Sequence, residues 1–407
     1  MKKIVFGITS LQIGGAERVL VDLANRLCDK FDITIFTIYD NGKLKSQISS
    51  KIKIISLYDK SYEEFSKLQK IKISLKLALF DKVPVGYDTY VAFLEGPITR
   101  LFAKSIKPNN TKRIAWVHND ISKVFGKGLK SKIKRALDKK MYKKYDKIIF
   151  VSKENQEDFN KTYGNNFNEE IIKNYIDYNR VIEKSNEKFD NPFDYNSINF
   201  VTSCRLVEQK ALDRFIKVHK KLEDNGFHSM VYVLGEGPLE EELKNQVKMY
   251  NVNDSFIFLG AKTNPYPYIK NADYFCLFSY YEGYGMVLEE AKILNKRILI
   301  TDTAAKECIE NYKDSRIFDN NENGIYNGLK EIIGGNNIRK NQETKINKSE
   351  TLINQDKIKT NHGNNYEEEY LNIQKTNEHK ANEKNVNNVE NIKEHYEKII
   401  EGIINIL

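Results

Sequence analysis

Short apolar, β-branched runs alternate with longer segments whose apolar residues recur every three or four positions through the first three quarters of the chain. The short runs are typical of strands buried on both faces, and the longer period is typical of amphipathic helices. The first unit reads as a strand over 2–8, a loop, and a helix over 16–27. Repeated alternation of this kind predicts an α/β protein with parallel sheets.

The pattern falls into two blocks. In the first block, strands are predicted at 2–8, 33–39, 90–94, 113–118 and 147–152. In the second block, they are predicted at 198–204, 230–235, 255–260, 274–279 and 297–301. A polar, Asn-rich stretch separates the blocks, as an interdomain linker would. We therefore expect two Rossmann-like domains, over 1–180 and 198–335, joined by a linker over 181–197.

The last part of the chain has a different character. Residues 336–388 are rich in Asn, Lys, Glu and Gln without a maintained period, which predicts a flexible insertion. The segment 389–407 then regains a helical period, through Val389, Ile392, Tyr396, Ile399, Ile403 and Ile406. A terminal amphipathic helix follows from this spacing. We favour packing against the protein's own body over a self-associating coiled coil, because the repeat is shorter than three heptads.

Composition limits the class of protein. The 407 residues, 40% of them apolar, suffice for two cores of ordinary size. No run approaches the roughly 20 apolar residues of a membrane-spanning helix, and the N-terminus leads directly into a strand, which predicts a cytoplasmic protein. The cysteines are far apart in the sequence, which predicts reduced, mostly buried thiols at Cys28, Cys204, Cys276 and Cys308.

Positive charge is concentrated in one segment. Residues 123–147 hold eleven Lys or Arg against Asp138 and Asp146, an excess equal to the formal net charge of +9 for the whole chain. One arc of the predicted helix there is apolar and comprises Leu129, Ile133, Ala136, Leu137 and Met141. Both a core-packed helix and contact with an anionic membrane surface fit this pattern. Nucleic acid is not expected, because no aromatic and basic recognition module accompanies the segment.

The most specific motif places Glu282 and Glu290 eight positions apart, around Gly283 and Gly285 at the start of a predicted helix. Glycines allow main-chain N–H groups to approach a ligand closely, and a helix N-terminus favours negative charge. Carboxylates beside such a turn suit sugar hydroxyls, which donate hydrogen bonds. The spacing of the two acids, taken alone, also fits an ordinary surface loop and helix with exposed acids.

Two cations and a histidine follow other predicted strands. Arg205 ends the strand at 198–204, and Lys210 begins the next helix; together they can bind a diphosphate. Gly14 and Gly15 lie between the first strand and helix, and His118 ends the strand at 113–118. Ligands of parallel α/β sheets bind at these carboxyl ends of strands.

Taken together, these motifs resemble the retaining GT-B glycosyltransferases of family 4, with Tyr284 where the aromatic is usually Phe. The resemblance implies that Glu282 addresses the donor sugar, Glu290 the ribose, and Arg205 and Lys210 the diphosphate. It also implies that the donor contacts Gly15, His118, Leu259, Gly260, Gly283, Tyr284, Gly285, Met286 and Val287. His118 would position the donor sugar.

The family's fold and chemistry are then the expectation: two Rossmann-like domains facing a central cleft, with a C-terminal helix. A retaining, metal-independent enzyme would move a sugar from a nucleoside-diphosphate sugar to a glycan or lipid-linked acceptor in cell-surface polysaccharide or glycoconjugate synthesis. No Asp-x-Asp triplet occurs in the chain, so no metal and no other cofactor is expected. Peripheral attachment at the inner face of the membrane through 123–147 is a further expectation. A non-catalytic GT-B accessory subunit and a nucleotide-sugar epimerase are the alternatives.

Overall fold

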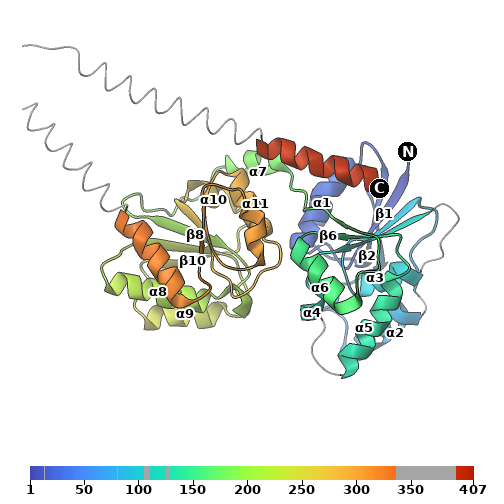
Figure 1. The fold of residues 1–407 in the computed structure, drawn as a ribbon, viewed down its shortest axis with the longest axis horizontal. Coiled ribbons are helices and arrows are strands. Elements are labelled where there is room, and N and C mark those ends of the chain that lie inside the picture. The colour runs from blue at the N-terminus through green and yellow to red at the C-terminus, as the bar shows by residue number, and fades with distance from the viewer. Residues whose placement is uncertain (13, 80, 105–110, 125–128, 336–390) are drawn as a thin grey trace, which may run out of the picture. The chain divides into compact units, whose positions relative to one another are not determined.

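The computed structural model describes all residues except 13, 80, 105–110, 125–128 and 336–390 (Figure 1). It divides into two compact units. Unit 1 comprises Met1–Asp177 with His395–Leu407, and unit 2 comprises Tyr178–Glu394. The expected insertion at 336–388 lies outside the described residues.

Unit 1 is built on a seven-stranded sheet in the order β3-β2-β1-β4-β5-β6-β7, in which every neighbouring pair is parallel. The strands are β1 (Lys3–Ile8), β2 (Asp32–Tyr39), β3 (Lys53–Tyr58), β4 (Thr89–Ala92), β5 (Lys112–Val117), β6 (Lys147–Phe150) and β7 (Glu169–Ile171). The helices are α1 (Gly15–Leu27), α2 (Lys67–Leu79), α3 (Pro97–Lys104), α4 (Ile121–Val124), α5 (Leu129–Tyr142) and α6 (Lys153–Tyr163), with a 3-10 turn η1 (Lys45–Gln47). The central strands are buried almost throughout, as their continuous apolar runs predict.

Unit 2 is built on a six-stranded parallel sheet in the order β10-β9-β8-β11-β12-β13. The strands are β8 (Asn199–Ser203), β9 (Met230–Leu234), β10 (Phe256–Gly260), β11 (Tyr274–Leu277), β12 (Arg297–Thr301) and β13 (Ser315–Phe318). The helices are α7 (Tyr178–Ser185), α8 (Leu212–Asp224), α9 (Glu240–Met249), α10 (Tyr266–Asn271) and α11 (Met286–Ile293), with 3-10 turns η2 (Glu208–Lys210) and η3 (Ala304–Ile309). A further helix covers 322–335.

The structure differs from the expected organisation in two respects. The segment expected as a linker, 181–197, begins inside α7, which packs on α10 and α11 because its Val181 is buried. The strands β3, β7 and β13 had no counterpart among the expected elements. All three are edge strands, and β7 and β13 are only three and four residues long, so their apolar signal is weak.

The terminal helix covers 391–406 and packs against unit 1, which confirms the favoured expectation. Its buried residues are Tyr396, Ile400, Ile403 and Ile406, followed by the terminal Leu407. Arg26 on α1 holds Glu397, with 2.8 Å between Nη2 and Oε2. Lys112 Nζ donates to the Ile406 carbonyl at 2.7 Å, which closes the end of the helix against β5.

The four cysteines, all within the described residues, form no disulfide; Cys276 and Cys308 are buried, and Cys28 and Cys204 are half-buried. Over the part of the chain that the structure describes, none of the helices combines the length and apolar character that a bilayer crossing requires.

Candidate active site

The predicted residues of unit 2 follow the carboxyl ends of its strands. β8 lies at the centre of the sheet, with β9 on one side and β11 on the other, so the strand order reverses between β8 and β11. Ligands of open α/β sheets bind at such a reversal, beyond the carboxyl ends of the strands. Arg205 follows β8, Gly260 ends β10, and Glu282 follows β11. These three residues therefore lie at the edge of the sheet where a ligand is expected.

Glu282 is a buried carboxylate, 7% exposed. Its Oε1 accepts a hydrogen bond from Ser279 Oγ at 2.6 Å and pairs with the Nζ of Lys210. A buried charge requires such partners, since an unpaired one is strongly disfavoured. Both donors reach the same oxygen, so the geometry leaves Oε2 as the atom that can accept a hydrogen bond from a ligand.

The Lys210 and Glu282 pair is held by main-chain contacts between two loops. The N–H of Tyr280 donates to the Gln209 carbonyl at 2.9 Å, and Gln209 Nε2 donates to the Tyr281 carbonyl at 3.0 Å. These bonds bind η2 to the loop that carries Glu282. The loop after β8 is therefore bonded directly to the loop after β11, although Lys210 and Glu282 are 72 residues apart in the sequence.

Arg214 on α8 also contacts the loop that carries Glu282. It is only 4% exposed, and its Nη2 donates to the Phe278 carbonyl at 2.6 Å. The guanidinium also stacks on Tyr280, 4.5 Å from the ring centroid. Arg214 and Ser279 were not among the predicted site residues; the position of Ser279 three residues before Glu282 was the available signal.

Glu290 lies one turn into α11 and is half-buried. Tyr266 on α10 donates from its hydroxyl to Glu290 Oε1 at 2.8 Å. Arg180 on α7 in turn donates to the Tyr266 hydroxyl at 3.0 Å and lies over its ring. Neither Tyr266 nor Arg180 was among the predicted site residues, because both belong to segments distant in the sequence.

The turn between the two acids is closely packed. The Tyr284 hydroxyl donates to Glu289 Oε1 at 2.7 Å, and buried Glu289 pairs with Lys292 at 2.8 Å. A Cβ on Gly285 would lie 2.8 Å from Leu288 Cδ1, so this position requires glycine or a shift of that side chain. Tyr284 is thus fixed to α11, and what the turn offers a ligand is its main chain from 283 to 287.

Glycines bring the loops after β9 and β8 together. Gly235 has φ +142°, and a Cβ there would meet the Cys204 carbonyl oxygen at 1.9 Å, so any other residue is excluded sterically. Its N–H donates to the Gly260 carbonyl at 3.0 Å. The predicted donor contacts Leu259 and Gly260 therefore lie beside the Arg205 loop. Arg205 itself is exposed.

Unit 1 holds the other predicted residues at the carboxyl ends of β1 and β5, and β4 lies between these two strands in its sheet. Glu95, which follows β4, was not predicted. Gly14 caps α1, and the helix begins at Gly15. The Glu17 carboxylate folds back over Gly14, and burial, with the charge of Glu95 as a smaller cause, raises its pKa. The Gly-Gly turn thus lies close to acids from two segments.

His118 follows β5 and is fixed on both sides. Its backbone N–H donates to Glu95 Oε2 at 3.1 Å, and Asn119 Nδ2 donates to the other oxygen. The imidazole packs against Phe93, 4.8 Å away, and lies 6.3 Å from Trp116, by ring centroids. Burial lowers the pKa of His118 to about 3, so the ring is neutral near pH 7. Nε2 is buried and has no hydrogen-bond partner among the described residues.

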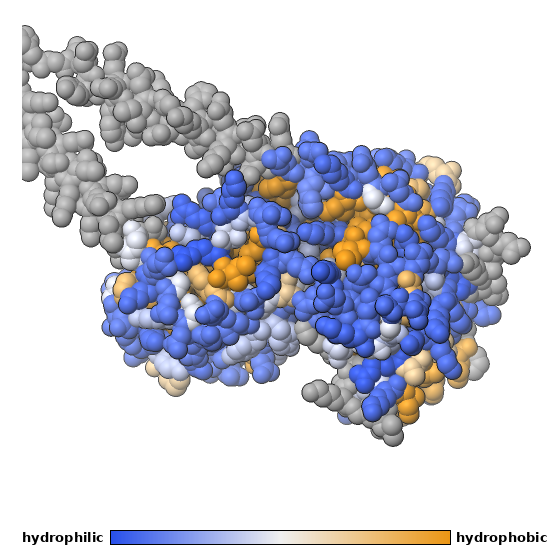
Figure 2. Space-filling model, in the orientation of Figure 1, coloured by the Kyte–Doolittle hydropathy of each residue, from blue (hydrophilic) through white to orange (hydrophobic). Residues whose placement is uncertain are grey.

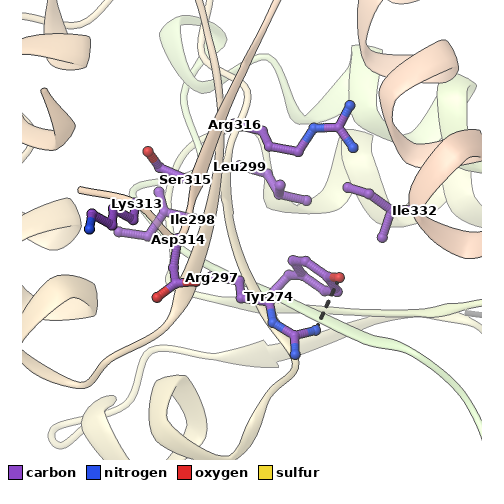
Figure 3. Close-up of a pocket in the computed structure, with 9 residues that line it drawn as sticks. All are labelled: Tyr274, Arg297, Ile298, Leu299, Lys313, Asp314, Ser315, Arg316 and Ile332. Carbon is purple, nitrogen blue, oxygen red and sulfur yellow. Dashed lines mark hydrogen bonds between the residues drawn. The ribbon is translucent and has the colours of Figure 1, made fainter. Parts of the chain in front are cut away.

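A cavity of about 200 Å³ in unit 2 lies at the opposite edge of the sheet (Figure 3). It is lined by the first residues of β11, β12 and β13, among them Tyr274, Arg297 and Arg316. None of the predicted site residues lines it. Within the described ranges, no group of three or more His, Cys, Asp or Glu side chains is placed to hold a metal ion.

Comparisons with known proteins identify the family. The family model described as Glycosyltransferase Family 4 matches residues 13–180, and the one described as Glycosyl transferases group 1 matches 183–349. An N-acetylgalactosamine-N,N'-diacetylbacillosaminyl-diphospho-undecaprenol 4-alpha-N-acetylgalactosaminyltransferase of Campylobacter jejuni is 27% identical, over 85% of this chain and 94% of its own. A second N-acetylgalactosaminyltransferase of that organism, acting on a diphospho-undecaprenol-linked glycan, is 25% identical over 84% and 91%.

Solved structures show the same fold. HepE of Anabaena, determined with UDP and glucose, superposes with a TM-score of 0.63 at 16% identity, over 82% of this chain and 90% of its own. WaaG, a glycosyltransferase involved in lipopolysaccharide biosynthesis, gives a TM-score of 0.55 at 14% identity, over 81% and 90%. The two parallel α/β units are those of a GT-B fold.

Proposed function

Because the chain belongs to the GT-B glycosyltransferases of family 4, we propose that it moves a sugar from a nucleoside-diphosphate sugar to a lipid-linked glycan, with retention of configuration and without a metal ion. The observation that carries the proposal is the buried Glu282 carboxylate, held through Oε1 by Lys210 and Ser279 at the strand reversal of unit 2. The carboxylate is arranged to orient a sugar through Oε2 and to stabilise positive charge developing at the anomeric carbon.

In this mechanism the donor nucleotide lies along the carboxyl edge of unit 2. Glu290 accepts hydrogen bonds from the ribose hydroxyls, and the main chain from 283 to 287 follows the phosphates at the start of α11. Arg205 and Lys210 offset the charge of the leaving diphosphate, as a metal ion would. The bond between the anomeric carbon and the diphosphate oxygen breaks, and the acceptor oxygen bonds that carbon on the same face. The acceptor hydroxyl gives its proton to the leaving diphosphate.

His118 of unit 1 is a further candidate. A neutral imidazole whose Nε2 lacks a protein partner can hydrogen bond a sugar hydroxyl without adding charge. Its ring is held by Phe93 and Trp116, so its direction is set before substrate arrives. We assign His118 as a positioning group for the donor sugar.

The names of the relatives support the choice of substrates. Two curated relatives are N-acetylgalactosaminyltransferases whose acceptors carry diphospho-undecaprenol, and the HepE structures contain UDP. We therefore propose a UDP-sugar donor and an acceptor linked to a polyprenyl diphosphate. A thermal-shift series with UDP-, GDP- and ADP-sugars tests the donor, because a ligand of the folded state raises apparent stability.

Transfer itself is tested with purified protein, a UDP-sugar and a polyprenyl-diphosphate glycan. Glu282→Ala and Arg205→Ala each abolish product, whereas Arg316→Ala, at the opposite edge of the same sheet, leaves the rate unchanged. Full activity of either site variant would refute the assignment. Product anomers resolved by NMR test retention, and an unchanged rate in EDTA tests metal independence.

The two alternatives make different predictions. An epimerase isomerises the donor sugar when no acceptor is present, whereas a transferase only hydrolyses it slowly. An accessory subunit binds without turnover. The joint presence of Glu282, Glu290, Arg205 and Lys210 at one edge favours turnover.

Attachment to the cytoplasmic face of the membrane through 123–147 belongs to the same proposal. On α5 the apolar residues Ile133 and Leu137 are 56% and 53% exposed, so the core-packed interpretation of this arc is wrong for both. The side chain of Leu129 lies outside the described residues, and Met141 is half-buried. Flotation with vesicles that contain or lack anionic lipid tests the attachment.

A further inference from the structure

α2 carries apolar side chains on two opposite faces. Ile73 is buried and Leu77 is partly buried, and both pack in the core cluster of unit 1. The opposite face bears Leu68, Ile71, Leu75 and Leu79, which are 75%, 59%, 55% and 68% exposed. Steps of three and four residues place these four in one row, about 16 Å long at 1.5 Å per residue. We call this row the α2 apolar row.

Contiguous apolar surface of this kind marks an interaction site, whereas single exposed apolar residues do not. Burial in the core explains only the other face of α2. The row therefore requires a partner outside unit 1's own core.

Lysines border the row. α2 contains Lys67, Lys70, Lys72 and Lys76 and no acidic residue. At 100° per residue, Lys67 lies on one side of the row and Lys72 on the other. Three acids stand beside the helix in the sequence: Glu63, Glu64, which accepts from the Ser61 N–H, and Asp81, which accepts from the Tyr58 hydroxyl. All charged side chains of α2 itself are positive.

α5, like α2, has one side packed against the protein and another side with exposed apolar residues. Its inner side holds buried Asp138, whose Oδ2 accepts from Arg100 Nη2 of α3 at 2.9 Å, and its outer side holds Ile133 and Leu137. α3 is also bonded to α2, because Lys104 Nζ donates to the Ala78 carbonyl at 2.7 Å. Both helices thus flank α3 on one face of the sheet, and Figure 2 shows apolar side chains gathered where they lie.

We propose that α2 is a membrane-docking helix that lies in the interface of an anionic bilayer, with the α2 apolar row among the acyl chains and its lysines on lipid phosphates. An apolar row bordered by basic residues suits such a surface. A second copy of the chain is disfavoured, because it would bring two positive surfaces together. The inference deepens the proposed function, since a lipid-linked acceptor is presented at a bilayer.

The test uses the full chain and sedimentation with vesicles of phosphatidylcholine, with and without phosphatidylglycerol. The probe variant is Ile71→Ser with Leu75→Ser. The matched control is Met249→Ser on α9 of unit 2, where the native side chain is 66% exposed. We expect the wild type and the control to bind anionic vesicles alike and the double variant to bind at least tenfold more weakly. Lys67→Gln with Lys72→Gln should reduce the preference for anionic over neutral vesicles.

Equal binding by the double variant, or no binding by the wild type, overturns the proposal. Lipid-free self-association that the double variant abolishes also overturns it and assigns the row to a second copy. Circular dichroism and donor thermal shift are measured for every variant. The substituted residues are exposed and lie outside the donor site. If the double variant keeps both its thermal shift with the nucleotide-sugar and its vesicle binding, only the docking inference is refuted. A missing donor shift in the wild type refutes the proposed function instead.

Discussion

Tyr266 donates a hydrogen bond from its hydroxyl to Oε1 of Glu290 at 2.8 Å. Burial, with the charge of Glu290 as the next cause, raises the pKa of Tyr266, so its phenol stays a donor at neutral pH. The bond fixes one carboxylate oxygen of Glu290. Tyr266 is therefore a positioning residue for the carboxylate that we assign to the ribose.

Tyr266→Phe should raise the KM for the nucleotide-sugar about tenfold and change kcat less than twofold. Loss of a hydrogen bond to a charged group costs about 1.5 kcal/mol, which corresponds to about tenfold in binding. Steady-state kinetics measure the effects on KM and kcat separately. Tyr268→Phe removes a hydroxyl from the same helix and should have no effect; equal effects from both variants would contradict the assignment.

Lys210→Gln should lower stability as well as activity. It leaves Glu282, 7% exposed, without its cationic partner, at a cost of about 3 kcal/mol. The double variant Lys210→Gln with Glu282→Gln should recover most of the melting temperature but no transfer activity. Calorimetry and a transfer assay measure the two separately, and a double variant as unstable as the single one would refute the charge argument.

His118 should make unit 1 less stable as the pH falls below 6.5. Burial lowers its pKa to about 3 in the folded protein, whereas an unfolded histidine titrates near 6.5. Between these values the unfolded chain binds the extra proton, so stability falls by up to about 1.4 kcal/mol per pH unit.

The measurement is denaturant unfolding at pH 7, 6 and 5, followed by the fluorescence of Trp116, the single tryptophan of the chain. His118→Gln should lose this part of the pH dependence. Burial raises the pKa of Glu95, which acts in the opposite direction, so the difference between wild type and variant isolates the histidine. Identical slopes would show that His118 titrates normally in the fold.

Ending the chain before His395 should destabilise unit 1 by more than about 3 kcal/mol, because five buried apolar residues from Tyr396 to Leu407 are removed from its surface. Trp116 fluorescence follows the loss. Glu397→Gln breaks only the half-exposed pair with Arg26 and should cost about 0.5 kcal/mol. Equal effects would mean that the ion pair, rather than apolar packing, holds the helix.

Much of the fold followed from local patterns. Every strand expected from an apolar run is present within a few residues, because a strand buried on both faces leaves a continuous apolar signal. β3 and β7 lie at the edges of their sheet and were not expected. The helical period of the terminal segment was evident, but only the structure shows which surface its apolar side covers.

Period and spacing along the chain were enough to identify the two α/β blocks, the acids at 282 and 290 and the cations at 205 and 210. Tertiary structure alone decided that Lys210 pairs with Glu282, that Tyr266 supports Glu290, and that the apolar residues of α2 divide between core and surface. The reason is physical. Each of these relationships joins segments that only the folding of a sheet brings together, and a one-dimensional pattern contains no information on which face of a helix finds a partner.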